Sequence, residues 1–286
     1  MYKKADLHLH TTASDGSDTP KELIAKARGN GLDIIAISDH DTLVGSLEAV
    51  RLPHDGIKIV TGIEFSCHHY GEVDFDCHIL GYGFDPEAQP MHDAIAHGRE
   101  MRLFKLEARL KYLYDRFGIS FCDEDIAYLH SLNSVARPHL GRLLVERGHA
   151  KDMIEAMDYY LKGSGFPDDR IDAREAIEAI RAAGGVPVYA HPIGGERETH
   201  LTHEAVLSRI EALKDLGLMG IECYYSRYSE KEEKMLTEIA EELGLLVSGG
   251  SDYHGENKTV KLGKLCADDI EIGADVISVL SAVCGE

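Results

Sequence analysis

The sequence predicts an α/β fold, a (β/α) barrel that carries an α-helical insertion. Short apolar runs of strand length alternate with helical patterns over most of the 286 residues. This alternation stops between residues 86 and 172, where only helical patterns occur. Clusters of His and acidic residues follow the strand-like runs, at the end of a barrel where ligands collect. About seven strands with interleaved helices favour one barrel, regular or irregular.

The first strand enters almost at once, near residue 5. A capped helix start follows at Thr19-Pro20-Lys21-Glu22, with Pro20 at the first helical position, and Gly31 marks its end. Apolar or β-branched runs bounded by Gly, Asp or Pro then predict strands at 33–38, 57–66 and 77–84.

The middle of the chain predicts helices at 91–117, 123–132, 137–147 and 152–162. A structureless loop of this length is improbable in a compact protein. We therefore expect residues 86–172 to form a cap domain over the strand ends, with 1–85 and 173–286 forming the barrel. Alternation then resumes with helix 173–183, strand 186–189, helix 202–216, strand 219–224, helix 230–243, strand 245–249 and helix 274–283.

Composition limits the partners and the compartment. Fifty acidic against thirty basic residues give a net charge of −20, which argues against binding of long nucleic acids but permits a small anionic substrate. The six cysteines show no Cys-x-x-Cys spacing and are expected to be reduced thiols. No apolar run approaches the roughly 20 residues of a membrane-spanning helix. We expect a cytoplasmic protein without a membrane or an obligate protein partner.

Four clusters rich in His and acidic residues follow strand-like runs, and two single residues lie between them. They are Asp6-Leu7-His8-Leu9-His10, Ser38-Asp39-His40-Asp41, Glu64, His78, Tyr189-Ala190-His191-Pro192 and Ser251-Asp252-Tyr253-His254. With sixteen His residues, about one His-x-His pair is expected by chance, so the first cluster alone is weak. Because these clusters share their placement at strand ends, we expect one metal centre and not scattered surface histidines.

These motifs resemble those of the PHP (polymerase and histidinol phosphatase) family over nearly the whole chain. The matching elements are D-L-H-x-H at 6–10, S-D-G at 14–16, S-D-H-D at 38–41, G-x-E at 62–64, x-H-I-L-G-Y at 77–82, A-H-P at 190–192 and G-S-D-x-H-G at 250–255. The run Ala136-Arg137-Pro138-His139 in the insertion is similar to the branch of small nucleoside-bisphosphate phosphatases and short-RNA 5′ exonucleases.

The resemblance implies a distorted (β/α)7 barrel with two or three divalent ions at the strand ends. One ion would be bound by His8, His10, Glu64 and Asp252, a second by Glu64, His78 and His191, and a third by Asp15, His40 and His254. The mixed imidazole and carboxylate set suits Mn²⁺, our first choice, or Fe²⁺ or Zn²⁺. Asp39 and Asp41 flank a ligand and are interpreted as orienting residues or helix caps.

Four further residues are predicted to bind substrate phosphate. Arg137 and His139 form a possible clamp, with a helix-start contact as the alternative role. Arg197 and Arg227 stand close to positions where related sequences carry another basic residue or a His, so they leave the particular substrate open.

The predicted activity is hydrolysis of a small nucleotide or sugar phosphate by metal-activated water, and the substrate that the resemblance favours is a nucleoside 3′,5′-bisphosphate. Glu64 would bridge two ions, and His191, His254 or His139 would protonate the leaving group. Alternatives are a 5′→3′ exonuclease on short RNA, a cyclic-phosphate phosphodiesterase, a histidinol-phosphate-type phosphatase and an amide-cleaving hydrolase. A non-catalytic metal-binding module is the alternative from another class.

Overall fold

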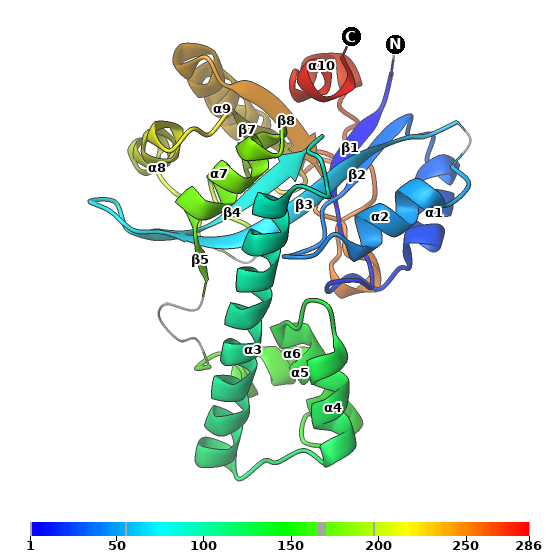
Figure 1. The fold of residues 1–286 in the computed structure, drawn as a ribbon, viewed down its shortest axis with the longest axis vertical. Coiled ribbons are helices and arrows are strands. Elements are labelled where there is room, and N and C mark those ends of the chain that lie inside the picture. Colours follow the sequence, from blue (N-terminus) through cyan, green and yellow to red (C-terminus); the bar gives the residue numbers. More distant parts are fainter. Residues whose placement is uncertain (1, 55, 165–169, 197, 286) are drawn as a thin grey trace.

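The strands form one strongly curved sheet in a computed structural model that describes residues 2–54, 56–164, 170–196 and 198–285 (Figure 1). The sheet order is β1-β2-β3-β4-β6-β7-β8, and β5 pairs with β3 off this path. The strands are β1 (Ala5–Leu9), β2 (Ile34–Ile37), β3 (Lys58–His69), β4 (Phe75–Tyr82), β5 (Ile171–Asp172), β6 (Val186–Tyr189), β7 (Gly220–Tyr225) and β8 (Leu246–Gly250).

The sheet is nearly closed into a barrel. Its last strand lies against its first, where the backbone N–H of His10 donates to the carbonyl of Tyr253 at 2.9 Å. A Cβ on Gly250 would lie 2.2 Å from the Cβ of His8, so only glycine permits this approach. The predicted seven-stranded α/β barrel is thus confirmed, with the short β5 added.

One part of the barrel departs from a regular (β/α) pattern. Strand β4 is antiparallel to both of its neighbours, β3 and β6, whereas the remaining neighbours pair in parallel. Strand β3 continues to His69, three residues beyond the predicted end, because it forms a long hairpin with β4. A functional side chain can therefore lie in the middle of a strand here, and not only at a strand end.

Helices cover the outside of the barrel. They are α1 (Pro20–Gly29), α2 (Val44–Arg51), α7 (Ala173–Ala182), α8 (His203–Asp215), α9 (Glu230–Leu243) and α10 (Val279–Cys284). Helix α1 has the predicted Thr19 capping box, whereas α2 lacks a side-chain cap and was not predicted. The helix predicted at 274–283 is wrong in part, because a 3₁₀ turn (Ala274–Val276) precedes α10.

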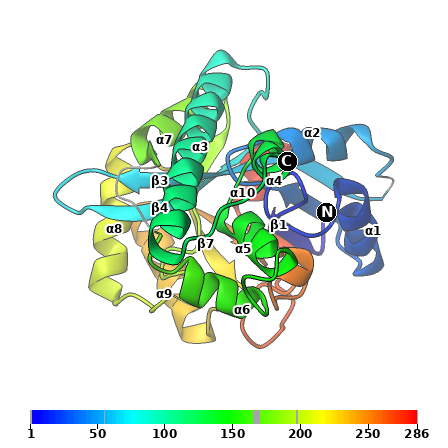
Figure 2. The same cartoon turned by 90° about the horizontal axis from the view of Figure 1, so that it is seen from below.

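The remaining helices form a lobe with a hydrophobic core of its own. This lobe contains α3 (Gln89–Phe117), α4 (Asp123–Ser131), α5 (Arg137–Glu146), α6 (Met153–Glu155) and a π-helical turn (Ala156–Tyr160). Its core includes Leu106, Leu113, Leu129 and Leu144, which are at most 1% exposed. Figure 2 shows α3, α5 and α6 lying across one end of the sheet. None of the helices in the described ranges is both long and apolar enough to cross a membrane.

Candidate metal centre

Strand β1 carries the first pair of candidate ligands into the barrel. His8 and His10 are two residues apart and share one face of the strand, and both are fully buried. Glu64 and His78 lie in the middle of β3 and β4 and not near strand ends as the predicted strands 57–66 and 77–84 would place them, because β3 continues to His69 and β4 begins at Phe75. The antiparallel ladder places His78 opposite Ser66, two residues from Glu64, which brings the carboxylate and the ring together.

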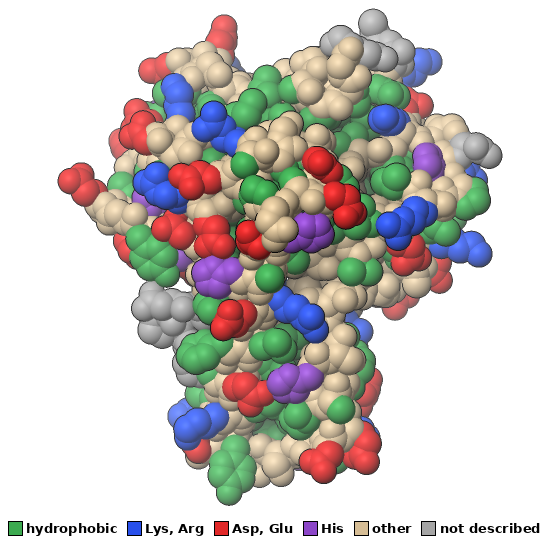
Figure 3. All heavy atoms as spheres, in the orientation of Figure 1, with side chains coloured by type: hydrophobic (Ala, Val, Ile, Leu, Met, Phe, Trp, Pro, Cys, Tyr) green, Lys and Arg blue, Asp and Glu red, His purple; other side chains and the backbone are tan. Residues whose placement is uncertain are grey.

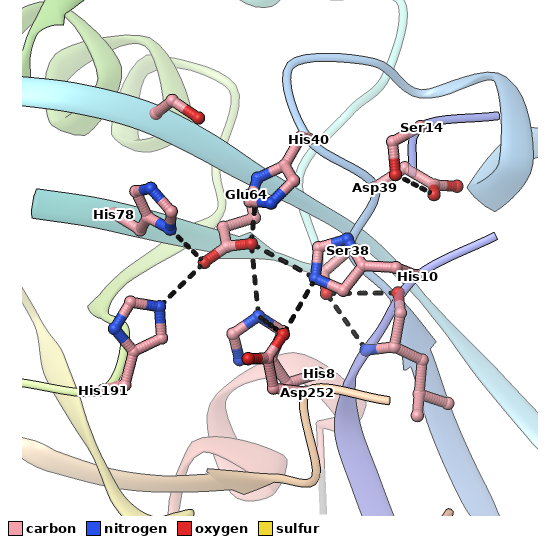
Figure 4. A network of polar contacts seen from close by, with 12 residues as sticks. His8, His10, Ser14, Ser38, Asp39, His40, Glu64, His78, His191 and Asp252 are labelled. Atoms are coloured by element: carbon pink, nitrogen blue, oxygen red, sulfur yellow. Dashed lines mark hydrogen bonds and ion pairs between the residues drawn. The ribbon is translucent and has the colours of Figure 1, made fainter. Parts of the chain in front are cut away.

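Glu64 lies at the centre of the site, and its two oxygens serve two groups of histidines (Figure 4). Its Oε2 is 3.2 Å from Nε2 of His8, 3.2 Å from Nε2 of His10 and 3.0 Å from Nδ1 of His40. Its Oε1 is 2.9 Å from Nδ1 of His78 and 3.3 Å from Nε2 of His191. This division suits a carboxylate that bridges two ions.

Two further carboxylates complete the cluster. Asp252 Oδ1 is 3.5 Å from Nε2 of His8 and 3.4 Å from Nε2 of His10. Asp15 Oδ1 is 3.2 Å from Nε2 of His254. Ligand atoms within 4.8 Å of one another form three groups: His8, His10 and Asp252; His40, Glu64 and His78; and His10, Asp15, His40 and His254. The three sets implied by the sequence overlap with these groups, although His10 and His40 each take part in two.

The donor atoms fit divalent ions. Several buried atoms have no hydrogen-bond partner within the described residues: His8 Nε2, His10 Nδ1 and Nε2, His40 Nδ1 and Glu64 Oε2. An unsatisfied buried polar atom costs about 1–3 kcal/mol, and a convergent set of such atoms is the environment that a Lewis acid satisfies. Burial acts to raise the pKa of Glu64, yet His40, His8 and His78 hold it well below its usual range. The carboxylate is therefore ionised, as a metal ligand must be.

Glu222 supports these ligands and was not predicted. Its carboxylate accepts a hydrogen bond from His8 Nδ1 at 2.9 Å and another from the backbone N–H of His191 at 2.8 Å. A proton on His8 Nδ1 leaves Nε2 free to bind a metal, so Glu222 fixes both the ring and its tautomer. The sequence signal that could have identified Glu222 is the G-I-E run at the start of β7.

Asp39 and Asp41 orient their surroundings, as predicted for residues that flank a ligand. Asp39 accepts hydrogen bonds from the backbone N–H of Thr11 at 2.7 Å and the hydroxyl of Ser14 at 2.6 Å, next to Asp15. Asp41 pairs with Nε of Arg102 at 2.5 Å. The two aspartates thus shape the loops that hold Asp15 and His40.

The predicted substrate residues have different surroundings. Arg137 is exposed at the first position of α5 and lines two clefts next to the metal centre. His139 is buried, and its Nδ1 accepts the backbone N–H of Ala136 at 3.0 Å, which is the helix-start contact. Arg227 donates to Oε1 of Glu196 at 3.0 Å, so this carboxylate already neutralises it. Arg197 lies outside the described residues.

Two clefts open from the centre, between the barrel and the helical lobe. The larger, about 440 Å³, has His40, Glu64, His78, His191 and Asp252 on the barrel side, and on the other side Pro138, Met153, Ile154 and Met157. The smaller, about 210 Å³, joins Asp15, His40 and His78 to Arg102, Lys105, Arg109, Arg137 and Arg170. This concentration of cations was not predicted, because the acidic total charge conceals it. On the outer face in Figure 3, basic and acidic side chains are instead intermingled.

Comparisons with known proteins agree with this geometry. The model of the PHP domain family matches residues 6–183. A 5′-3′ exoribonuclease of Haemophilus influenzae is 32% identical over 92% of this chain and 94% of its own length. A 3′,5′-nucleoside bisphosphate phosphatase of Chromobacterium violaceum is 30% identical over 87% of this chain and 86% of its own. A solved structure assigned as a metal-dependent phosphoesterase of Bifidobacterium adolescentis superposes with a TM-score of 0.77, at 30% identity over 93% of both chains.

Proposed function

The chain belongs to the PHP domain family and is a metal-dependent phosphoesterase, and we propose that it hydrolyses a small nucleotide of the nucleoside 3′,5′-bisphosphate type. The observation that carries this proposal is the position of Arg137. It lines both clefts, as His40 and His78 do, and its guanidinium can bind two phosphoryl oxygens at once.

We propose that the nine residues predicted from the sequence bind two or three ions, with Mn²⁺ as the first choice and Fe²⁺ or Zn²⁺ as alternatives. Bound there, the ions supply a Lewis acid that polarises the phosphoryl group and activates water. Glu64 sets the spacing of the donor groups, and Glu222 holds His8 and the backbone of His191 in place. In this proposal residues 86–172 are the cap domain, which covers the site and supplies Arg137.

The leaving oxygen needs a proton, and the clefts narrow the choice of donor. Of the three histidines considered, His191 lines the larger cleft. His254 is 2% exposed and His139 is 4% exposed, and neither lines either cleft described above. We therefore propose that the proton reaches the leaving oxygen from the part of the larger cleft that His191 lines. Lys258 lines the same cleft, and its Nζ donates to Asp252 at 2.6 Å.

A second candidate is 5′→3′ cleavage of short RNA. The similarity to the exoribonuclease of Haemophilus influenzae supports it, as does the larger cleft, whose apolar wall of Pro138, Met153 and Ile154 offers packing for a sugar or base. In both candidates a phosphate is attached to a nucleoside, so the same metal chemistry serves each.

A phosphate-release screen tests the proposal. Mn²⁺-loaded protein is given nucleoside bisphosphates, histidinol phosphate, cyclic phosphates and di- to tetranucleotides, and its metal content is measured by elemental analysis. We expect at least two equivalents of metal and the highest kcat/KM for a bisphosphate. Less than one equivalent in folded protein would contradict the site, and preferred turnover of histidinol phosphate or a cyclic phosphate would contradict the substrate class.

A further inference from the structure

A row of basic residues faces the metal centre from the helical lobe. Arg102, Lys105 and Arg109 follow one another at spacings of three and four along α3, so they share a face of that helix. Arg170, which directly precedes β5, joins them in the smaller cleft. We call these four residues the cation wall. The opposite side of the same cleft carries Asp15, His40 and His78 of the metal centre.

Two described carboxylates pair with arginines of the wall, and neither of them pairs with Arg109. Asp41 pairs with Arg102 at 2.5 Å, and Asp76 lies 3.2 Å from Arg170. Arg109 is 9% exposed, no described carboxylate forms an ion pair with it, and its Nε has no hydrogen-bond partner among the described residues. A buried cation without an anion is costly, and a strongly perturbed ionisable group that lines a cleft is a candidate for contact with a ligand.

The positive charges also act on one another. Burial and the neighbouring Arg170, Arg109 and Arg102 lower the pKa of Lys105 to about 6. Burial and the neighbouring Arg137, Arg102 and Arg170 lower the pKa of Arg109 to about 9. An anion bound between these side chains would relieve this repulsion and restore the charge of Lys105.

We propose that the cation wall is the subsite for a second phosphate group of the substrate, one nucleoside away from the phosphate that is hydrolysed. The inference rests on the proposed function, which places the scissile phosphate between Arg137 and the metal ligands. Lys105, Arg109 and Arg170 then bind the other phosphate within the same cleft, while Arg102 is held by Asp41. The second group is either the other phosphate of a nucleoside bisphosphate or the next phosphodiester of a short RNA.

The test compares substrates that differ by one phosphate. Metal-loaded wild-type protein, Lys105→Gln and Arg109→Gln are assayed with a nucleoside 3′,5′-bisphosphate, the two matching monophosphates and a 5′-phosphorylated dinucleotide. We expect the ratio of kcat/KM for the bisphosphate to that for a monophosphate to fall at least about tenfold in each variant, because a charge-assisted contact is lost. A fall for the dinucleotide but not the bisphosphate would assign the subsite to RNA.

Lys111→Gln is the matched control. It removes the same charge from the same helix, but Lys111 is exposed and pairs with Asp115 outside the clefts, so the ratio should stay within about twofold of wild type. Should Arg109→Gln fail to fold, the half-buried Lys105 still answers the question.

Two results would overturn the inference. One is a folded Lys105→Gln protein whose kcat/KM is unchanged for the bisphosphate and for the dinucleotide alike. The other is an equal fall for the bisphosphate, the dinucleotide and the monophosphates. Asp168 and Asp169 precede Arg170 in the sequence and lie outside the described residues. If the wall serves only as a partner for acidic residues of its own chain, Lys105→Gln lowers the melting temperature without changing the ratio, which also overturns the inference. Turnover of none of these esters by wild-type protein would contradict the proposed function itself.

Discussion

The metal centre and the cation wall lie on opposite sides of one cleft, but they are built differently. The centre consists of buried and half-buried residues on strands and adjoining loops; Glu222 fixes the ring of His8, and Asp39 fixes the loop that carries Asp15. The wall consists of long, flexible side chains on α3 and before β5, and its Arg109 has an unsatisfied Nε. Rigid ligands suit chemistry that requires fixed geometry, whereas a set of long cations can accommodate different phosphate-bearing substrates. On our proposal, the residues that bind the metal ions lie in the barrel, whereas the cations that select the substrate come from the helical lobe and the segment before β5.

The largest effect is expected at the centre of the rigid region. Glu64→Gln keeps the size of the side chain but removes the negative charge shared by two groups of histidines. We expect kcat to fall by a factor on the order of 10³ or more, with lower metal content, because an amide is a poor bridging ligand. Stopped assays, elemental analysis and circular dichroism measure rate, metal and folding. A near-normal rate with normal metal content would show that Glu64 does not bridge.

Arg137 tests the boundary between the two regions, since it lines both clefts. Arg137→Ala should leave metal content unchanged and reduce kcat/KM for phosphomonoesters by a factor of about 10². Arg137→Lys should recover part of this loss, because an ammonium lacks the planar fork of a guanidinium. If Arg137→Ala instead lowers the melting temperature at intact activity per folded molecule, Arg137 is a structural helix-start residue and the helical lobe supplies no contact from Arg137 to the scissile phosphate.

Glu222 tests whether the centre depends on its supporting groups. Glu222→Gln has one acceptor oxygen where the carboxylate offers one to His8 and another to the backbone of His191. We expect metal affinity to weaken by about tenfold, the lower end for lost supporting hydrogen bonds. Competition with a chelator measures this affinity. An unchanged affinity would mean that the strands alone fix the histidines.

The smallest effect is expected at Glu233, a buried carboxyl that lines neither cleft, and it provides a baseline for the other variants. Glu233 on α9 is 8% exposed, and burial together with Glu230, Asp268 and Glu232 raises its pKa to about 7. The folded state therefore retains a proton that the unfolded state releases near pH 4.5, so this carboxyl lowers stability as the pH rises from about 5 to 7. Glu233→Gln should raise the melting temperature more at pH 8 than at pH 5, with unchanged activity. Thermal unfolding at both pH values checks this, and an equal shift at both would contradict the raised pKa.

The sequence allowed much of the barrel to be predicted, but not the hairpin at its centre. Apolar runs located seven strands because buried strands carry a strong local signal. The two-residue β5 and the uncapped α2 gave no such signal. The antiparallel pairing of β3 and β4 is not visible in the local sequence pattern, so the placement of His78 beside Glu64 required the structure.

The predicted ligand types lie together, whereas the smaller cleft was missed. Arg102, Lys105 and Arg109 form a visible stripe at helical spacing, but a charged stripe usually faces solvent. Only the packing of α3 against the barrel, and the arrival of Arg170 from another segment, turns this stripe towards the metal centre. The assignments of the metal ligands and of the substrate contacts stay predictions until the variants above are measured.

The contact between β1 and β8 determines how late during synthesis the site can form. His8 and His10 leave the ribosome first, whereas Asp252 and His254, which complete their groups, follow more than two hundred residues later. For most of its translation, the nascent chain therefore contains only part of each of these ligand groups. Tight capture of ions has to wait until β8 lies against His8 at Gly250. A metal ion that binds only the complete set of ligands then stabilises the closed barrel. Metal binding therefore selectively stabilises chains whose translation is complete.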